Sequence, residues 1–324
     1  MQKILFLVLF ITILPVYVFA ETFDKSKCDF METDKNVIKK LEVQGIYQNN
    51  KTGVVCYSIN DIKFFEKDVM FPIKNGKVAG IVKIYFKGSG ALVSETPYKN
   101  GEKDGIEKVY FTSGALMFEI PYKNGKKDGI GKKYFASGAL SVEIPYKNGE
   151  KDGIEKGYYE SGDLYTEISY KNGIQEGIEK LYYESGALHT EIPFKNDIKE
   201  GIGKSYYKSG ALKIELPFKN DKAEGLKKEY YESGALIFET PYKNGKAEGI
   251  GKRYYGSGAL MQEIPYKNDK VEGIGKSYKE DGRLFSTVTY QNDKVISGKC
   301  ANGRKWTNAE INNWEKGLDV VCGR

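Results

Sequence analysis

Residues 105–123 read Gly-Ile-Glu-Lys-Val-Tyr-Phe-Thr-Ser-Gly-Ala-Leu-Met-Phe-Glu-Ile-Pro-Tyr-Lys, and Asn124-Gly125 follows them. Two short runs of aromatic and aliphatic residues are separated by Ser-Gly and closed by Asn-Gly, which is the pattern of β-strands joined by tight turns. The second run alternates, with Leu116 and Phe118 on one side and Glu119 on the other, as in a half-buried strand. A helix is disfavoured because Gly or Pro interrupts each run within about six to nine residues.

The same unit recurs every 24 residues along the chain. Nine glycines mark the period: Gly90, Gly114, Gly138, Gly162, Gly186, Gly210, Gly234, Gly258 and Gly282. A fixed period of this size indicates one supersecondary unit copied in a row, in which neighbouring copies stabilise one another. We therefore predict an all-β fold, an elongated antiparallel β-hairpin solenoid. Such an array offers a long regular surface rather than one enclosed catalytic pocket, so the chain is not expected to be an enzyme.

Each hairpin has a predicted register. A two- or four-residue loop at Ser-Gly places Phe111 opposite Leu116 and Lys108 opposite Glu119, whereas a three-residue loop breaks this match. Each Lys–Glu pair across two strands contributes about 0.2–1 kcal/mol. Proline recurs late in the second run, as at Pro121. Because proline cannot donate to a ladder, we expect it at a strand end or a bulge.

Several first runs end in two adjacent tyrosines, as in Tyr182-Tyr183. Adjacent strand residues face opposite sides of a sheet. One tyrosine of each pair is therefore expected to pack inward and its neighbour to lie on the other face, giving two aromatic columns. The candidate binding face is marked by Tyr158, Tyr182, Tyr206, Tyr230 and Tyr254.

Residues 1–20 are expected to be a signal peptide. Lys3 supplies the positive start, Ile4 to Val18 is apolar, and Val18-Phe19-Ala20 fits a cleavage site before Glu21. An uncleaved membrane anchor is the alternative, but the apolar stretch is short for a span of about 20 residues. This pattern predicts an exported protein, located in the periplasm, on the cell surface or in the medium.

The repeats are flanked by two expected caps, so the chain divides into a signal peptide (1–20), an N-terminal cap (21–73), the repeat array (74–297) and a C-terminal cap (298–324). The four cysteines, Cys28, Cys56, Cys300 and Cys322, all lie in the caps. An even number in an exported protein suggests disulfides. Of three possible connectivities, Cys28–Cys56 and Cys300–Cys322 are the local pairs, and each would staple one cap. A metal site is the alternative, although the spacing does not match zinc ligands.

The C-terminal cap is expected to contain a short helix, from about Asn308 to Lys316. Thr307 and Glu310 have the spacing of a capping box, and Trp306 and Ile311 are placed to form a hydrophobic staple. The N-terminal cap is expected to hold a hairpin of residues 41–47 and 54–59.

The sequence contains no recognisable catalytic set, phosphate loop or metal motif, and we predict no cofactor. The single histidine, His189, occupies a variable strand position and is expected on the surface. One carboxylate precedes the glycine that begins each hairpin, from Asp104 before Gly105 to Glu272 before Gly273. A calcium ladder is conceivable for this column, but a solvated, lysine-paired column is favoured because lysine is abundant nearby. The 50 basic and 44 acidic residues are interleaved, which argues against nucleic acid as a partner.

The unit resembles the bacterial variant of MORN repeats, most clearly at Tyr206-Tyr207-Lys208-Ser209-Gly210-Ala211-Leu212 followed by Phe218-Lys219-Asn220. The resemblance covers about residues 62–297. Proteins with this array are often placed with a YwqK-like antitoxin group, which implies a role in protein interaction. In eukaryotes, MORN repeats accompany lipid kinases and junction proteins as scaffolds or membrane-association modules. The resemblance implies hairpins stacked into a twisted antiparallel sheet, and it carries no catalytic residues.

These observations predict a non-catalytic exported scaffold whose long face binds a partner protein. The alternative is a module that binds cell-envelope carbohydrate or an anionic membrane surface. The sequence does not identify the partner.

Overall fold

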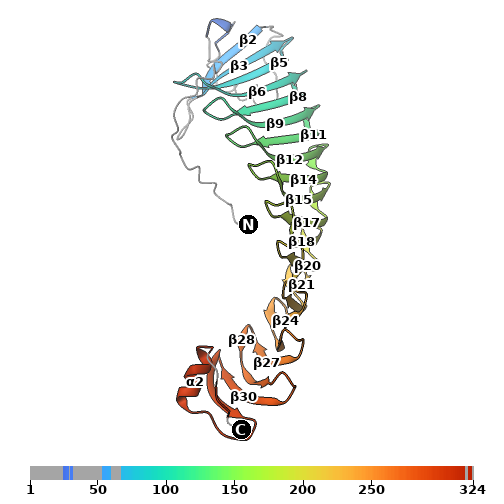
Figure 1. Ribbon diagram of the computed structural model, residues 1–324. Coiled ribbons are helices and arrows are strands. Elements are labelled where there is room, and N and C mark those ends of the chain that lie inside the picture. Colours follow the sequence, from blue (N-terminus) through green and yellow to red (C-terminus); the bar gives the residue numbers. More distant parts are fainter. Residues whose placement is uncertain (1–24, 29, 32–52, 60–66, 318–319, 323–324) are drawn as a thin grey trace. The chain divides into compact units, whose positions relative to one another are not determined.

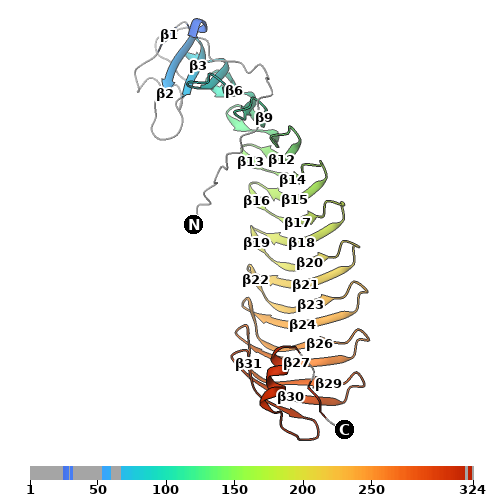
Figure 2. The same ribbon diagram turned by 60° about the vertical axis from the view of Figure 1, so that its left-hand side comes forward.

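The computed structural model describes residues 25–28, 30–31, 53–59, 67–317 and 320–322. The expected signal peptide, residues 1–20, and the first strand of the expected N-terminal hairpin, residues 41–47, lie outside them. The chain forms two compact units, Met1–Gly149 and Glu150–Arg324. In both units the strands form an open antiparallel sheet, as predicted, apart from β1, which runs parallel to β2 (Figures 1 and 2).

The first unit contains a short 3₁₀ helix and the strands up to β12. They are η1 (Lys25–Lys27), β1 (Phe30–Met31), β2 (Gly53–Ile59), β3 (Lys67–Lys74), β4 (Lys77–Val78), β5 (Gly80–Phe86), β6 (Leu92–Lys99), β7 (Glu102–Lys103), β8 (Gly105–Tyr110), β9 (Leu116–Lys123), β10 (Lys126–Lys127), β11 (Gly129–Tyr134) and β12 (Leu140–Lys147).

The second unit contains the remaining strands and one α-helix. They are β13 (Glu150–Lys151), β14 (Gly153–Tyr158), β15 (Leu164–Lys171), β16 (Ile174–Gln175), β17 (Gly177–Tyr182), β18 (Leu188–Lys195), β19 (Ile198–Lys199), β20 (Gly201–Tyr206), β21 (Leu212–Lys219), β22 (Lys222–Ala223), β23 (Gly225–Tyr230), β24 (Leu236–Lys243), β25 (Lys246–Ala247), β26 (Gly249–Tyr254), β27 (Leu260–Lys267), β28 (Lys270–Val271), β29 (Gly273–Tyr278), β30 (Leu284–Gln291), β31 (Lys294–Cys300) and α2 (Asn308–Glu315).

The predicted register of the repeat hairpin is confirmed at the Lys–Glu pair and is wrong next to the Ser-Gly loop. Lys108 lies opposite Glu119, as predicted, but Tyr110 rather than Phe111 lies opposite Leu116. The backbone N–H of Phe111 donates to the carbonyl of Ala115, which leaves a three-residue loop, and a bulge follows it. The loop shifts the pairing by one residue and the bulge shifts it back, so the Lys–Glu match survives.

The Asn-Gly positions form the second turn of each copy. Asn124 (φ 49°) and Gly125 (φ 77°) are both left-handed, which is the geometry of a two-residue type I′ turn. Some copies have aspartate in place of the glycine, as at Asp197 (φ 63°). There the aspartate side chain offsets the cost of the left-handed conformation, because Asp197 accepts a hydrogen bond of 2.6 Å from the backbone N–H of Gln175 in the preceding copy.

Pro121 sits in β9 opposite an irregularity of the neighbouring strand, in keeping with its expected place at a strand end or bulge. The N–H of Asp128, between β10 and β11, donates to the carbonyl of Pro121. A Cβ on Gly129 would lie 3.2 Å from the proline ring, and Gly129 has φ of +113°. Glycine is therefore required where the chain bends around the proline.

Tightly packed cores lie at the two ends of the repeat array, where the caps meet the first and last hairpins. Val55, Val69 and Val78 belong to the first core, and Val288 and Trp306 to the second. From residue 100 to residue 285, all of which are described, Ala247 and Pro265 are the only buried aliphatic or aromatic side chains. The repeats are thus held by half-buried side chains and hydrogen bonds on a single-layered sheet, rather than by a shared core.

The C-terminal cap forms as expected around α2. Thr307 and Glu310 make both hydrogen bonds of the capping box. Arg304 and the N–H of Thr307 hold the Glu310 carboxylate and lower its pKa to about 2. Glu315 accepts a hydrogen bond from the N–H of Val295 on the last strand, β31. The helix therefore covers an edge strand that would otherwise be open to pairing.

Disulfides close both caps with the local connectivity, Cys28–Cys56 and Cys300–Cys322. Disulfides of this kind are typical of proteins from oxidising compartments. Among the described residues, no helix has the length and hydropathy that a membrane span requires.

Candidate binding surfaces

The candidate tyrosines are bound to glutamates of the preceding hairpin. The hydroxyls of Tyr182, Tyr206, Tyr230 and Tyr254 donate to Glu167, Glu191, Glu215 and Glu239 at 2.7–3.0 Å. All four rings are half-buried, as is that of Tyr158. The column therefore ties each repeat to the next, and its hydroxyls are already engaged within the protein.

The second tyrosine of each pair lies on the opposite face and also bridges two repeats. The hydroxyl of Tyr183 donates to the carbonyl of Tyr206, and that of Tyr207 to the carbonyl of Tyr230, at 2.7–2.8 Å. The two predicted aromatic columns are present, and their polar ends form an inter-repeat hydrogen-bond ladder.

Burial, together with the hydrogen bond to a carboxylate, raises the pKa of Tyr134, Tyr182, Tyr206, Tyr230 and Tyr254 to about 12. The unfolded chain releases these protons near the ordinary value of 10.0, while the folded chain still holds them. The contribution of these tyrosines to the free energy of unfolding should therefore be constant below pH 10.0 and be lost as pH rises through 10.0 toward about 12.

Tyrosinate absorbance and circular dichroism, followed together during an alkaline titration, check this prediction. Glu191→Gln removes a neighbouring charge, so it should lower the pKa of Tyr206 and leave that of Tyr254 unchanged. Titration of all the tyrosines as in an unfolded peptide, with folding intact, would contradict the ladder.

Lysine and glutamate alternate beside the Tyr–Glu contacts. Lys204 lies opposite Glu215 in its own hairpin and opposite Glu191 of the preceding copy. The Lys204–Glu191 ion pair measures 3.9 Å and the equivalent Lys276–Glu263 pair 3.2 Å. These pairs are partly exposed, so water screens them and each contributes little to stability. Their main consequence is a striped surface of alternating charge.

A column of exposed isoleucines runs beside this charged stripe. In the second unit it consists of Ile154, Ile178, Ile202, Leu226, Ile250 and Ile274, with 39–61% of each residue exposed. Ile202 lies directly opposite Pro217 and two residues before Lys204, so the apolar and charged columns share one face. We call this face, defined by the six residues, the isoleucine face. Ile81, Ile106 and Ile130 hold the same position in the first unit and are also about half exposed.

The opposite face of the sheet is called here the cleft face. On it, lysine side chains lie over the tyrosine rings of neighbouring strands. The ammonium of Lys151 lies 4.5 Å from the ring centre of Tyr170, and Lys103 lies 4.6 Å from Tyr122. Such cation–π contacts give a column of aromatic rings that lysines cover.

The carboxylates that precede the first glycine of each hairpin, from Asp104 to Glu272, accept hydrogen bonds from backbone N–H groups. Each accepts the backbone N–H of the turn asparagine in the following copy, as Glu224 does from Asn244 at 2.7 Å. The same contact occurs in all eight copies from Asp104 to Glu272, at 2.7–3.5 Å. The expected lysine pairing is not found among the described residues, where these carboxylates bind backbone N–H groups instead. Among the described residues, no cluster of His, Cys, Asp or Glu could hold a metal ion.

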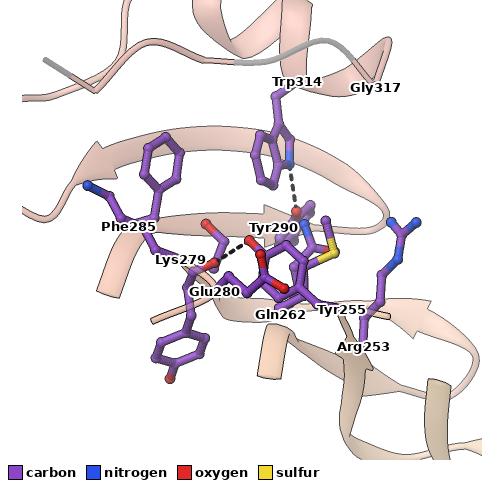
Figure 3. Close-up of a pocket in the computed structure, with 12 residues that line it drawn as sticks. Arg253, Tyr255, Gln262, Lys279, Glu280, Phe285, Tyr290, Trp314 and Gly317 are labelled. Carbon is purple, nitrogen blue, oxygen red and sulfur yellow. Dashed lines mark hydrogen bonds between the residues drawn. The ribbon is translucent and has the colours of Figure 1, made fainter. Parts of the chain in front are cut away.

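A cleft of about 600 Å³ opens on the cleft face beside α2 (Figure 3). Trp314 extends from the helix toward Tyr290, and its indole N–H donates to the Tyr290 hydroxyl at 2.9 Å. Tyr255, Phe285, Arg253 and Gln262 also line it. His189 is far along the array from this cleft and is exposed, as expected.

The model of a family described as MORN repeat variant matches residues 103–124, 127–148, 151–172, 175–196, 199–220, 223–244 and 247–268. The chain carries seven tandem MORN repeats of this variant type. Each matched MORN repeat runs from the end of a two-residue strand through one hairpin to the turn asparagine, so the family unit coincides with the structural unit.

Comparison with the curated proteins gives no match. Two crystal structures are similar in part. TcdB2-TccC3-Cdc42 has 11% identity over 79% of this chain, and TcdB2-TccC3 has 12% over 72%, each with a TM-score of 0.18. This chain covers only 14% and 16% of those chains. A TM-score this low carries no argument about fold or function.

Sequence reasoning identified the tyrosines and missed the isoleucine face. The available signal was the isoleucine or leucine that follows the first glycine of each hairpin, as in Gly201-Ile202, in a strand that also carries a lysine. The cleft was also missed, because it combines repeat residues with Trp314 of the cap.

Proposed function

We propose that this protein is a non-catalytic, exported repeat scaffold that binds a partner protein along its isoleucine face. The observation that carries the proposal is the column of exposed apolar residues in successive MORN repeats. Single exposed apolar residues need no explanation, but a contiguous apolar strip marks an interaction site. The disulfides and the apolar N-terminal segment support export.

The distance between successive isoleucines indicates which kind of partner would fit the column. Successive isoleucines are separated by two strands, which is about 10 Å. An α-helix that presents one apolar residue per heptad repeats about every 10.5 Å, and it fits such a row over several copies. The alternating Lys–Glu stripe beside the column would then select the partner's charged positions. We propose a long helical or coiled-coil segment as the preferred partner.

The triple variant Ile202→Ser, Leu226→Ser, Ile250→Ser tests this function. Loss of about 1 kcal/mol for each covered side chain predicts weakening of binding by more than about a hundredfold. Crosslinking and affinity capture from an envelope extract, followed by titration of the captured protein, measure this effect.

Ile174→Ser with Ile198→Ser provides a matched control, because both are exposed apolar residues outside the column, at 41% and 37%. The control should bind as the unaltered protein does. If the triple variant retains the same partner with the same affinity, the isoleucine face is not the binding site.

A further inference from the structure

We propose that the cleft beside α2 binds a short linear oligosaccharide. This site lies on the cleft face and is independent of the function proposed for the isoleucine face. Its volume of about 600 Å³ lies within the usual range for small-molecule sites, about 300–1,000 Å³.

The aromatic walls of the cleft are held in place by hydrogen bonds to the protein. Trp314 donates to the hydroxyl of Tyr290 at 2.9 Å, and the hydroxyl of Tyr255 donates to the carbonyl of Tyr278 at 2.8 Å. In Figure 3, Trp314 and Phe285 stand on the same side of the cleft, with Tyr255 across from them. Because their polar ends are satisfied internally, these rings offer preorganised apolar faces.

Three long polar side chains of the cleft have no partner among the described residues. Arg253, Gln262 and Glu280 make no hydrogen bond or ion pair with any residue that the structure describes, and all three line the cleft. Arg253 and Gln262 lie directly opposite each other on β26 and β27. Gln262 is half-buried, so its carboxamide has lost part of its water without gaining a protein partner.

Gln262 also departs from the pattern of the six preceding repeats, and it does so opposite a charged residue. The equivalents of Gln262 are aliphatic, aromatic or threonine in the preceding copies: Phe118, Val142, Thr166, Thr190, Ile214 and Phe238. The position of Arg253 varies among the copies and holds Val109, Lys133, Gly157, Leu181, Ser205 and Glu229. Among the repeats from residue 103 to residue 268, only this copy places two long polar side chains at these opposite positions, and the repeat architecture itself does not require them.

A sugar ring matches this combination of surfaces. A pyranose has an apolar face of C–H groups, which stacks on an aromatic ring, and a rim of hydroxyls that donate and accept hydrogen bonds. Guanidinium, carboxamide and carboxylate groups together offer donors and acceptors to such a rim. A wholly apolar ligand would leave Arg253 and Gln262 desolvated and unpaired, and a simple ion would not use the aromatic walls.

We expect a ligand longer than one sugar ring because a second hollow adjoins the cleft at Arg253. That hollow has a volume of about 470 Å³, is lined by Phe238, Tyr242 and Tyr266, and shares Arg253 with the first. Arg253 therefore stands between two adjoining spaces with aromatic linings. A linear oligosaccharide that runs along the repeats would occupy both.

Fluorescence of the full-length Trp306→Phe protein tests the site. Trp306 is 7% exposed and its indole N–H has no partner among the described residues, so phenylalanine removes an unsatisfied donor and leaves Trp314 as the only tryptophan, which can be excited selectively. The probes are cellotetraose, chitotetraose and tetragalacturonate. At least one should change the fluorescence saturably, and saturation-transfer NMR on the unaltered chain should detect the same sugar.

Arg253→Val with Gln262→Val should weaken that binding at least about tenfold, or 1.4 kcal/mol, while keeping the melting temperature, because valine occurs at both positions in other copies. Lys133→Val, at the equivalent of Arg253 in another repeat, should leave binding unchanged. No saturable response to any probe up to about 10 mM overturns the proposal. Binding that survives the double substitution, or a response to peptides alone, also overturns it. The isoleucine-face variants should bind the sugar normally, so failures of the two proposals are distinguishable.

Discussion

Gly298→Ala is expected to unfold the C-terminal cap. A Cβ at this position would lie 2.0 Å from Cε3 of Trp306, and the backbone N–H of Trp306 donates to the carbonyl of Gly298 at 2.8 Å. The indole cannot move away without losing its place in the core with Val288, Val295 and Cys300. Displacing a buried tryptophan costs about 3–5 kcal/mol, a large part of the stability of a small cap.

The consequence should extend beyond the cap, because α2 covers the last strand of the sheet. Without Trp306 in place, Glu315 no longer holds the N–H of Val295, and β31 becomes an open edge. We therefore expect both a lower melting temperature and concentration-dependent association in size-exclusion chromatography.

Gly256→Ala is the matched control for Gly298→Ala. Gly256 has open space around its Cα and an ordinary φ, so alanine should change stability by less than about 0.5 kcal/mol. Equal melting temperatures for the two variants would show that the tryptophan does not clamp the cap.

Deleting residues 177–200 should leave a folded protein that is one repeat shorter, whereas deleting residues 189–200 should abolish ordered stacking. The 24-residue deletion joins Glu176 to Gly201, a junction equivalent to the natural Glu200–Gly201. Tyr206 then meets Glu167 in place of Glu191, and the hydrogen-bond ladder closes again.

The 12-residue deletion removes all of β18 after Leu188. β17 and β20 both run antiparallel to β18, so they are parallel to each other. Parallel strands cannot be joined by the few residues that remain, because a crossover of about a dozen or more is needed. The array should therefore split into two parts with unpaired edges.

Circular dichroism and size-exclusion chromatography distinguish the two deletions. The longer deletion should keep the β-sheet signal per residue and elute as a discrete species, and the shorter one should aggregate. A well-folded 12-residue deletion variant would contradict the antiparallel hairpin as the structural unit.

Local chemistry made much of the fold predictable. The Asn-Gly and Ser-Gly turns, the Lys108–Glu119 register, the helix at Thr307 and both local disulfides follow from short-range patterns. The loop at Phe111 was not predictable from such patterns, because a one-residue bulge can offset a one-residue change of loop length. The carboxylates at Asp104 to Glu272 were misassigned because their partner lies 20 residues away on another copy.

The candidate sites were less predictable than the fold. The tyrosine columns were foreseen, but their hydroxyls are engaged between repeats, and the exposed positions are instead the isoleucines. Whether an apolar strand residue is covered depends on what lies on each face of the sheet, and sequence alternation alone does not show that. The cleft depends on Trp314 lying over Tyr290, 24 residues earlier.

The amino-acid sequence by itself determined the repeat length, the hairpins and the caps, because turn residues and alternating strands act over a few residues. Only the tertiary structure decided which face stays exposed, where the tightly packed cores lie and which polar groups are left without partners. Those features arise from contacts between copies and between the array and its cap, and a periodic sequence specifies each copy almost identically.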